Sequence, residues 1–161
     1  MRRLNLVLWV GLLLAGCVSP SPYGYLVKGV VPPQMPERLA QDTVMRMEAV
    51  YPPAHTRLAL THPATDVYGV ALIQALRHKG YGVMEHVDTH VIPSTRDEQH
   101  ARIERPAVSH GEGVPFRYVV DGPFEPRLYR LTVFIGSQSL SRVYRMDAHV
   151  IAQAGAWVRK E

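Results

Sequence analysis

The only cysteine in this chain of 161 residues is Cys17, and its position limits the possible folds more than any other feature. With one thiol, no disulfide can form within the chain, so a packed apolar core has to hold the fold. The cysteine follows a basic start, Arg2 and Arg3, and an apolar run over residues 6–15. That run is too short to span a bilayer, which takes about 20 residues. The layout instead predicts a secretory signal peptide over residues 1–16.

The residues around the predicted cleavage point add a second expectation. The sequence Leu14-Ala15-Gly16-Cys17 looks like the lipobox of bacterial lipoproteins. In such proteins the chain is cut before the cysteine, here between Gly16 and Cys17; the cysteine sulfur carries a diacylglycerol, and the new amine can take a further fatty acid such as palmitate. Two or more acyl chains give stable anchoring, at about 0.8 kcal/mol per buried methylene. Because Val18 stands where an aspartate would favour the inner membrane, we expect an outer-membrane anchor at Cys17 with the domain in the periplasm. No other cofactor is expected.

Residues 17–36 are predicted to form an extended tether, because their prolines remove backbone donors and favour extended conformations. At about 3.1 Å per residue, this segment can hold a domain some tens of Å from the lipid. Within it, residues 25–31 are β-prone. They fit either a first edge strand of the domain's own sheet or a strand lent to a partner. The candidate contact residues in this stretch are Tyr25, Leu26, Val27, Val30 and Val31.

The first half of the domain predicts helix, strand, helix and strand in that order. Residues 37–50 have apolar side chains at helical spacing and end at Tyr51-Pro52-Pro53. Residues 56–61 alternate as in a half-buried strand. Thr65 or Asp66 can cap a second helix that Gly80 ends, and residues 81–84 follow as a strand. The apolar set predicted for the second helix is Tyr68, Val70, Ala71, Leu72, Ala75 and Leu76.

The second half changes to a period of two after a long loop over residues 86–113. Loops of that length are uncommon unless they are functional or disordered. One apolar and one polar face then indicate an antiparallel meander with a solvent-facing side. The predicted strands cover residues 115–121, 128–135 and 140–151, with a hairpin turn over residues 136–139. We therefore expect a single α+β domain over residues 37–161, with two helices on a mostly antiparallel sheet.

Charge and motifs exclude several classes of function. The formal net charge is +4, and it falls to +2 when the two arginines of the signal peptide are removed (4 − 2). This charge is scattered and forms no basic stripe, so direct contact with nucleic acid is not expected.

Catalytic and metal chemistry are not indicated either. The turn Gly136-Ser137-Gln138-Ser139 lacks the second glycine of a nucleophile elbow and stands in a hairpin. His86 and His90, with Asp88 between them, span too much length on a strand for a compact metal site. His100 and His110 could join them only through the loop. We expect no enzyme and no metal site.

Arginines in the late strands are candidates for partner binding. Arg130, Arg142 and Arg145 predict a positive, exposed face, with Tyr129 or Tyr144 nearby. Arginine and tyrosine protect the solvent-facing side of a sheet against aggregation, and they are also enriched in interface hot spots, so both interpretations stay open.

Near the end of the chain, Trp157 is a further candidate contact. It either packs the last segment onto the domain or, if exposed, marks a docking point.

Taken together, these residues resemble the TrbH family of conjugal transfer lipoproteins. The resemblance covers nearly the whole chain apart from residues 86–113. Besides the lipobox, it rests on Tyr51-Pro52-Pro53-Ala54, Asp66, Ala71-Leu72, Leu76-Arg77, Gly80-Tyr81, Tyr129-Arg130-Leu131, residues 140–145 and Gly155-Ala156-Trp157.

The resemblance implies a structural, non-enzymatic role in the type IV secretion apparatus that forms mating pairs and moves plasmid DNA between cells. Its expected partners are other channel or pilus-assembly proteins, within a multi-subunit ring, and the lipid of the outer membrane. The alternative is a periplasmic lipoprotein that binds an envelope component, or a metal through the histidine loop.

Overall fold

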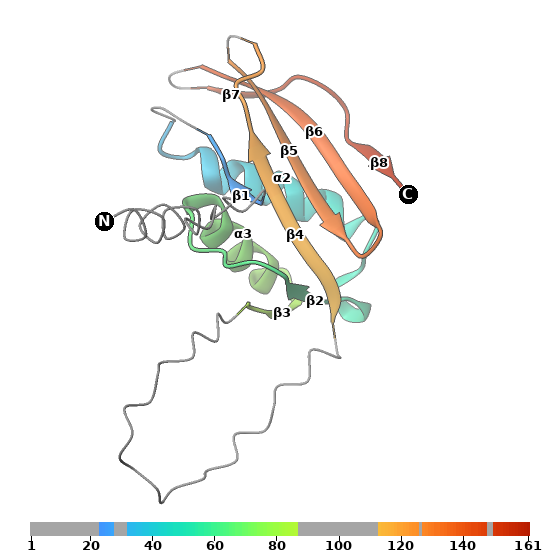
Figure 1. Cartoon of the computed structure of the whole chain (residues 1–161). Coiled ribbons are helices and arrows are strands. Elements are labelled where there is room, and N and C mark those ends of the chain that lie inside the picture. The colour runs from blue at the N-terminus through green and yellow to red at the C-terminus, as the bar shows by residue number, and fades with distance from the viewer. Residues whose placement is uncertain (1–22, 28–31, 87–112, 126, 148–149) are drawn as a thin grey trace, which may run out of the picture.

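The fold is a mixed sheet with two α-helices on one of its faces (Figure 1). The computed structural model describes residues 23–27, 32–86, 113–125, 127–147 and 150–161. The strand order along the sheet is β3-β2-β4-β5-β6-β7, while β1 pairs with β4 and β8 pairs with β6. The α+β class and the mostly antiparallel sheet predicted from the sequence are confirmed.

Helix α2, Met35–Glu48, begins two residues before the predicted start. Pro36 lies in its first turn, where a missing backbone donor costs nothing, and Glu37 complements the positive end of the helix dipole. The predicted apolar face is confirmed as buried: it consists of Leu39, Thr43, Val44 and Met47. A short 3₁₀ turn, η2, Pro53–His55, connects this helix to the sheet.

The next unit runs from strand β2, Arg57–Leu60, through helix α3, Val67–His78, to strand β3, Gly82–Met84. Strands β2 and β3 are parallel, as a crossover helix requires. Asp66 caps α3 as predicted, because its Oδ1 accepts from the backbone N–H of Gly69 at 2.8 Å. The predicted apolar set of α3 is wrong at Val70, which is 45% exposed. Ile73, which that set left out, is buried instead, because its spacing of four residues from Gly69 and three from Leu76 places it on the sheet-facing side of the helix.

Three long antiparallel strands form the centre of the sheet. They are β4, Val114–Asp121, β5, Leu128–Ile135, and β6, Gln138–Met146. Ile135 pairs with Gln138, so the β5–β6 turn has two residues, and Gly136 supplies the positive φ of 59° that such a turn needs. Alternate side chains pack under the helices and form one apolar core with them.

The third predicted late strand does not run on to residue 151. Strand β6 ends at Met146, where Asp147 and Val150 exchange backbone hydrogen bonds of 2.9 and 3.3 Å and reverse the chain. Strands β7, Ile151–Gln153, and β8, Val158–Lys160, then both pair antiparallel with β6. The chain end therefore returns along the edge of its own sheet, and the expected three-stranded meander gains two further short strands.

The first described segment also belongs to the sheet. Strand β1, Gly24–Tyr25, pairs parallel with β4 at Val119 and Val120, and the N–H of Leu26 donates to the Val120 carbonyl at 2.8 Å. For these residues the own-sheet alternative is confirmed. The expected signal peptide, the tether before Tyr23 and the lipidation residue lie outside the described residues, as do Val30, Val31 and most of the loop over residues 86–113.

Among the helices that the structure describes, neither α2 nor α3 has the length and apolar character needed to cross a membrane.

Gly69 allows α3 to approach the sheet, and replacing it tests this packing. An added Cβ would stand 2.0 Å from Tyr118 Oη and 2.9 Å from Ala64 Cβ. Overpacking of this kind typically costs about 1–3 kcal/mol, although alanine gains about 1 kcal/mol of helix propensity. We expect Gly69→Ala to lower the urea midpoint of unfolding. Gly155→Ala is the matched control, because its Cβ meets nothing within 4 Å, and equal midpoints for the two variants would contradict the packing argument.

Candidate functional site

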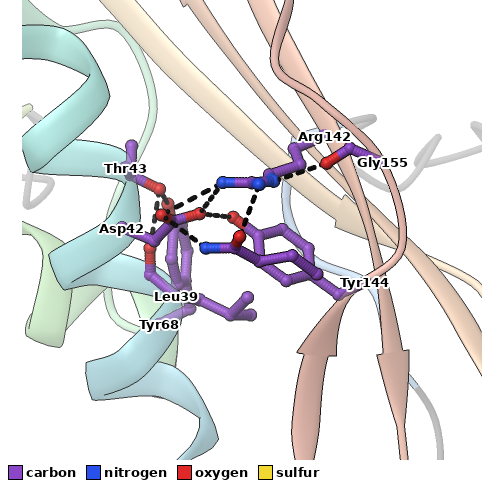
Figure 2. Close-up of polar contacts among 8 residues, drawn as sticks. Leu39, Asp42, Thr43, Tyr68, Arg142, Tyr144 and Gly155 are labelled. Carbon is purple, nitrogen blue, oxygen red and sulfur yellow. Dashed lines mark hydrogen bonds and ion pairs between the residues drawn. The ribbon is translucent and has the colours of Figure 1, made fainter.

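A polar group that joins several elements of the fold is centred on the carboxylate of Asp42, on the sheet-facing side of α2. Figure 2 shows that side chains from the sheet converge on it. Arg142 Nη1 lies 3.0 Å from Oδ2 and 3.2 Å from Oδ1. The hydroxyl of Tyr144 donates to Oδ2, and Gln153 Nε2 donates to Oδ1 at 3.2 Å. We call these four residues the Asp42 centre.

Arg142 extends the Asp42 centre to the end of the chain. Its Nε donates to the carbonyl oxygen of Gly155 at 2.8 Å, and its Nη2 donates to Gln153 Oε1 at 2.6 Å. The guanidinium also lies 5.9 Å from the ring of Trp157. The Arg142 and Asp42 side chains are only 14% and 15% exposed, so water screens their attraction weakly. One side chain thus joins α2, β6, β7 and the C-terminal segment.

The chemistry of this centre is that of a fixed ion pair. Burial, followed by the hydrogen bond to Asp42, raises the pKa of Tyr144, which keeps the hydroxyl protonated as a donor. Beside it, Thr43 Oγ1 donates to the Leu39 carbonyl at 2.7 Å and lies 3.0 Å from the hydroxyl of Tyr68. Each of these groups has a partner inside the fold. This arrangement supports a structural role for the centre.

A second polar group, around Asp66, joins α3 to the sheet. While Oδ1 caps the helix, Oδ2 accepts from the hydroxyl of Tyr118 at 2.6 Å. Burial, followed by the hydrogen bond to Asp66, raises the pKa of Tyr118, so this hydroxyl also stays a donor. The backbone N–H of Tyr118 donates to His62 Nε2 at 3.3 Å, which satisfies that buried imidazole. This group also serves the fold.

The exposed positive face predicted for the late strands is wrong at Arg142. Its position in β6, between Leu140 and Tyr144, places it on the inner face, where the Asp42 carboxylate compensates its charge. Tyr144 is likewise buried, at 2% exposure. Arg130 and Arg145 are exposed on the other face of the sheet.

Trp157 packs partly buried against the core, and so do Tyr25 and Val27. Leu26 is 44% exposed. Trp157 thus matches the packing alternative given for it from the sequence. The other predicted site residues, Gly16, Cys17, Val30 and Val31, lie outside the described residues.

Sequence reasoning missed Asp42 and Gln153. A partial signal existed for Asp42, since it directly precedes Thr43 in the buried stripe of α2 and follows Leu39 by three residues. Gln153 gave none. Within the described ranges, no group of three or more His, Cys, Asp or Glu residues could hold a metal ion. Of the histidines considered as metal ligands from the sequence, only His86 belongs to the described residues; His90, His100 and His110 lie outside them.

A groove of about 620 Å³ lies between α2 and α3 on their solvent side. Its lining includes the apolar side chains of Val44, Ala71 and Ala75 and the charged side chains of Glu37 and Lys79. A smaller hollow of about 330 Å³ borders the Asp42 centre, between α2 and strand β7.

Comparison with known protein families identifies a match over most of the chain. The family model described as conjugal transfer protein TrbH matches residues 21–161. No curated protein and no solved structure matches the chain.

Removing the charge of Asp42 tests the role of the Asp42 centre. Asp42→Asn keeps the size of the side chain but leaves the Arg142 guanidinium without its counter-charge. We expect a loss of about 1–3 kcal/mol in the free energy of unfolding, together with faster amide exchange in residues 151–158. Asp121→Asn is the control, because its pair with the half-exposed Arg130 is a surface pair worth about 1 kcal/mol or less. Equal losses in the two variants would contradict this role.

Buried tyrosines predict lower stability at alkaline pH. Burial raises the pKa of Tyr25 and that of Tyr81 to about 12. An unfolded tyrosine ionises near pH 10, so between about pH 10 and about pH 12 the unfolded chain loses protons that the folded chain keeps. The contribution of these two tyrosines to the free energy of unfolding is therefore complete below about pH 10, and it is lost as the pH rises through about 12. Urea titrations at a series of pH values should show this decline in the free energy of unfolding. The decline with pH should be smaller for Tyr81→Phe, and an identical decline in the variant and the unchanged protein would refute the role of this hydroxyl.

Proposed function

We propose a role that starts from one premise: this chain belongs to the TrbH family of conjugal transfer proteins. It is therefore a component of a conjugal transfer system, the machinery that passes DNA from a donor cell to a recipient. Beyond this premise, we propose that the protein is a lipoprotein anchored in the outer membrane through Cys17. It acts there as a structural component of the secretion channel or its pilus-assembly machinery, in contact with the other transfer proteins.

The observation that supports the anchor is the sequence around Cys17. A basic start, a short apolar run and small residues precede the only cysteine of the chain, and a proline-containing segment follows it. Acyl chains on that sulfur and on the new amine would hold the chain at a bilayer without a membrane-spanning helix.

The structural, non-catalytic part of the proposal rests on how the chain uses its buried polar groups. Asp42 joins the helical layer to the C-terminal segment, and Asp66 joins α3 to β4. Tyr144 and Tyr118 are held as neutral donors by burial and by these carboxylates. These polar groups bond to one another within the fold and make it rigid, as an assembly subunit requires.

We place the contact with other transfer proteins at residues 25–31. In a β-strand, successive N–H groups point to opposite edges. The N–H of Leu26 is bonded to β4, so the N–H of Tyr25 points to the other edge, which no described strand covers. Pairing with the own sheet and pairing with a partner are therefore compatible, because they use opposite edges of one strand.

Cys17→Ser tests the anchor and its importance together. Serine cannot accept the thioether-linked lipid, so we expect the protein to leave the outer-membrane fraction and the conjugation frequency to fall several-fold. Ser21→Ala is the control, since it changes a nearby residue and keeps the cysteine. Normal fractionation and normal transfer by the serine variant would refute the anchored role.

A further inference from the structure

The face of the sheet opposite the helices is open. Both helices pack on the other side, and among the described segments only Tyr23, at the start of the fold, lies on this one (Figure 1). We call it the outer face. Its positions alternate with the buried ones: Phe134 lies opposite Arg117, and Arg130 lies between Asp121 and Val143.

The outer face combines apolar side chains with positive charge. On the outer face, strands β4, β5 and β6 have three arginines, Arg117, Arg130 and Arg145, and one acidic residue, Asp121. Phe124, in the β4–β5 turn, is 59% exposed and lies 4.8 Å from the Arg130 guanidinium; Val143 is 36% exposed. Aromatic rings beside arginines suit the boundary between lipid headgroups and acyl chains, where rings enter and cations meet phosphates.

The chain enters the fold on this same face. The Tyr23 ring makes an edge contact with the ring of Phe134, with centroids 6.1 Å apart, and the Arg117 guanidinium lies 4.9 Å from each ring. Tyr23 is therefore fixed to the outer face, and any free tether ends there. This shortens the tether expected from the sequence, because residues 23–25 are part of the domain.

The remaining tether is too short for the domain to move away from the lipid. Six residues, 17–22, separate the proposed acylated cysteine from Tyr23, and fully extended they reach about 20 Å. A domain of this length is roughly 35–40 Å across. A tether shorter than the domain's own width keeps the side that carries Tyr23 close to the bilayer.

We propose that the outer face lies against an anionic phospholipid bilayer, with Phe124 and Arg145 in the headgroup region and the two helices directed away from it. The inference rests on the proposed acylation of Cys17. It leaves the groove between α2 and α3 and the free edge of β1 open to other proteins.

Acylation makes a direct test possible, because it consumes the only thiol of the chain. A single added cysteine can then carry a spin label in the full-length, acylated protein. The protein is reconstituted into vesicles of phosphatidylethanolamine and phosphatidylglycerol. Labels at Phe124→Cys and Arg145→Cys report on the outer face. Labels at Met45→Cys and Val70→Cys are matched controls on the helices, and all four sites are exposed.

We expect the two outer-face labels to collide several-fold more with oxygen, which dissolves in the bilayer, than with a water-soluble nickel chelate. The two helix labels should show the opposite preference. Replacing phosphatidylglycerol with phosphatidylcholine should weaken the outer-face preference.

Three results would overturn the proposal. If the protein sediments with vesicles while all four labels stay equally accessible to the chelate, the orientation is wrong and the anchor stands. If the outer-face labels become protected only when other transfer proteins are added, the face is a protein interface. If the protein does not sediment with vesicles at all, the proposed anchor fails as well.

Discussion

The ion pair between Asp42 and Arg142 is the contact that connects the separate parts of this fold. Apolar burial holds the helices on the sheet, but it is non-directional and does not fix how the last strands lie. The Arg142 guanidinium reaches a carboxylate on α2, an amide on β7 and a carbonyl in the C-terminal segment. A largely buried charge is tolerated only when its partners satisfy it, and here they come from residues 42, 153 and 155. The pair therefore requires helix, sheet and chain end to be in place together.

The one-sided arrangement of the layers follows from the same sequence pattern. Alternation in β4, β5 and β6 sends one set of side chains into the core and leaves the other set uncovered. Two helices are enough to cover one face. The other face keeps arginines and aromatic rings near the point where Tyr23 enters the fold. With the proposed anchor at Cys17, one of these two unlike sides would meet lipid and the other would meet proteins.

Much of the fold follows from local signals in the sequence. Pro36 and Gly80 mark helix ends by their backbone geometry, Asp66 marks the start of α3 by its side-chain cap, and period-two patterns mark the strands. Arg142 could not be placed that way, because its charge argued for solvent while its position between Leu140 and Tyr144 argued for the core. Only Asp42, one hundred residues away in the chain, resolves this conflict. The reversal after Met146 and the docking of Tyr23 likewise depend on contacts with distant strands, which no local pattern shows.

The proposed lipid at Cys17 underlies both the anchor and the membrane-facing sheet, and one measurement tests it directly. The protein would be extracted from the outer membranes of donor cells that carry the transfer system, and its intact mass would be determined. We predict the mass of residues 17–161 plus covalently bound acyl chains. A chain that retains residues 1–16, or one that begins at Cys17 without lipid, would contradict the anchor and the membrane-facing sheet derived from it.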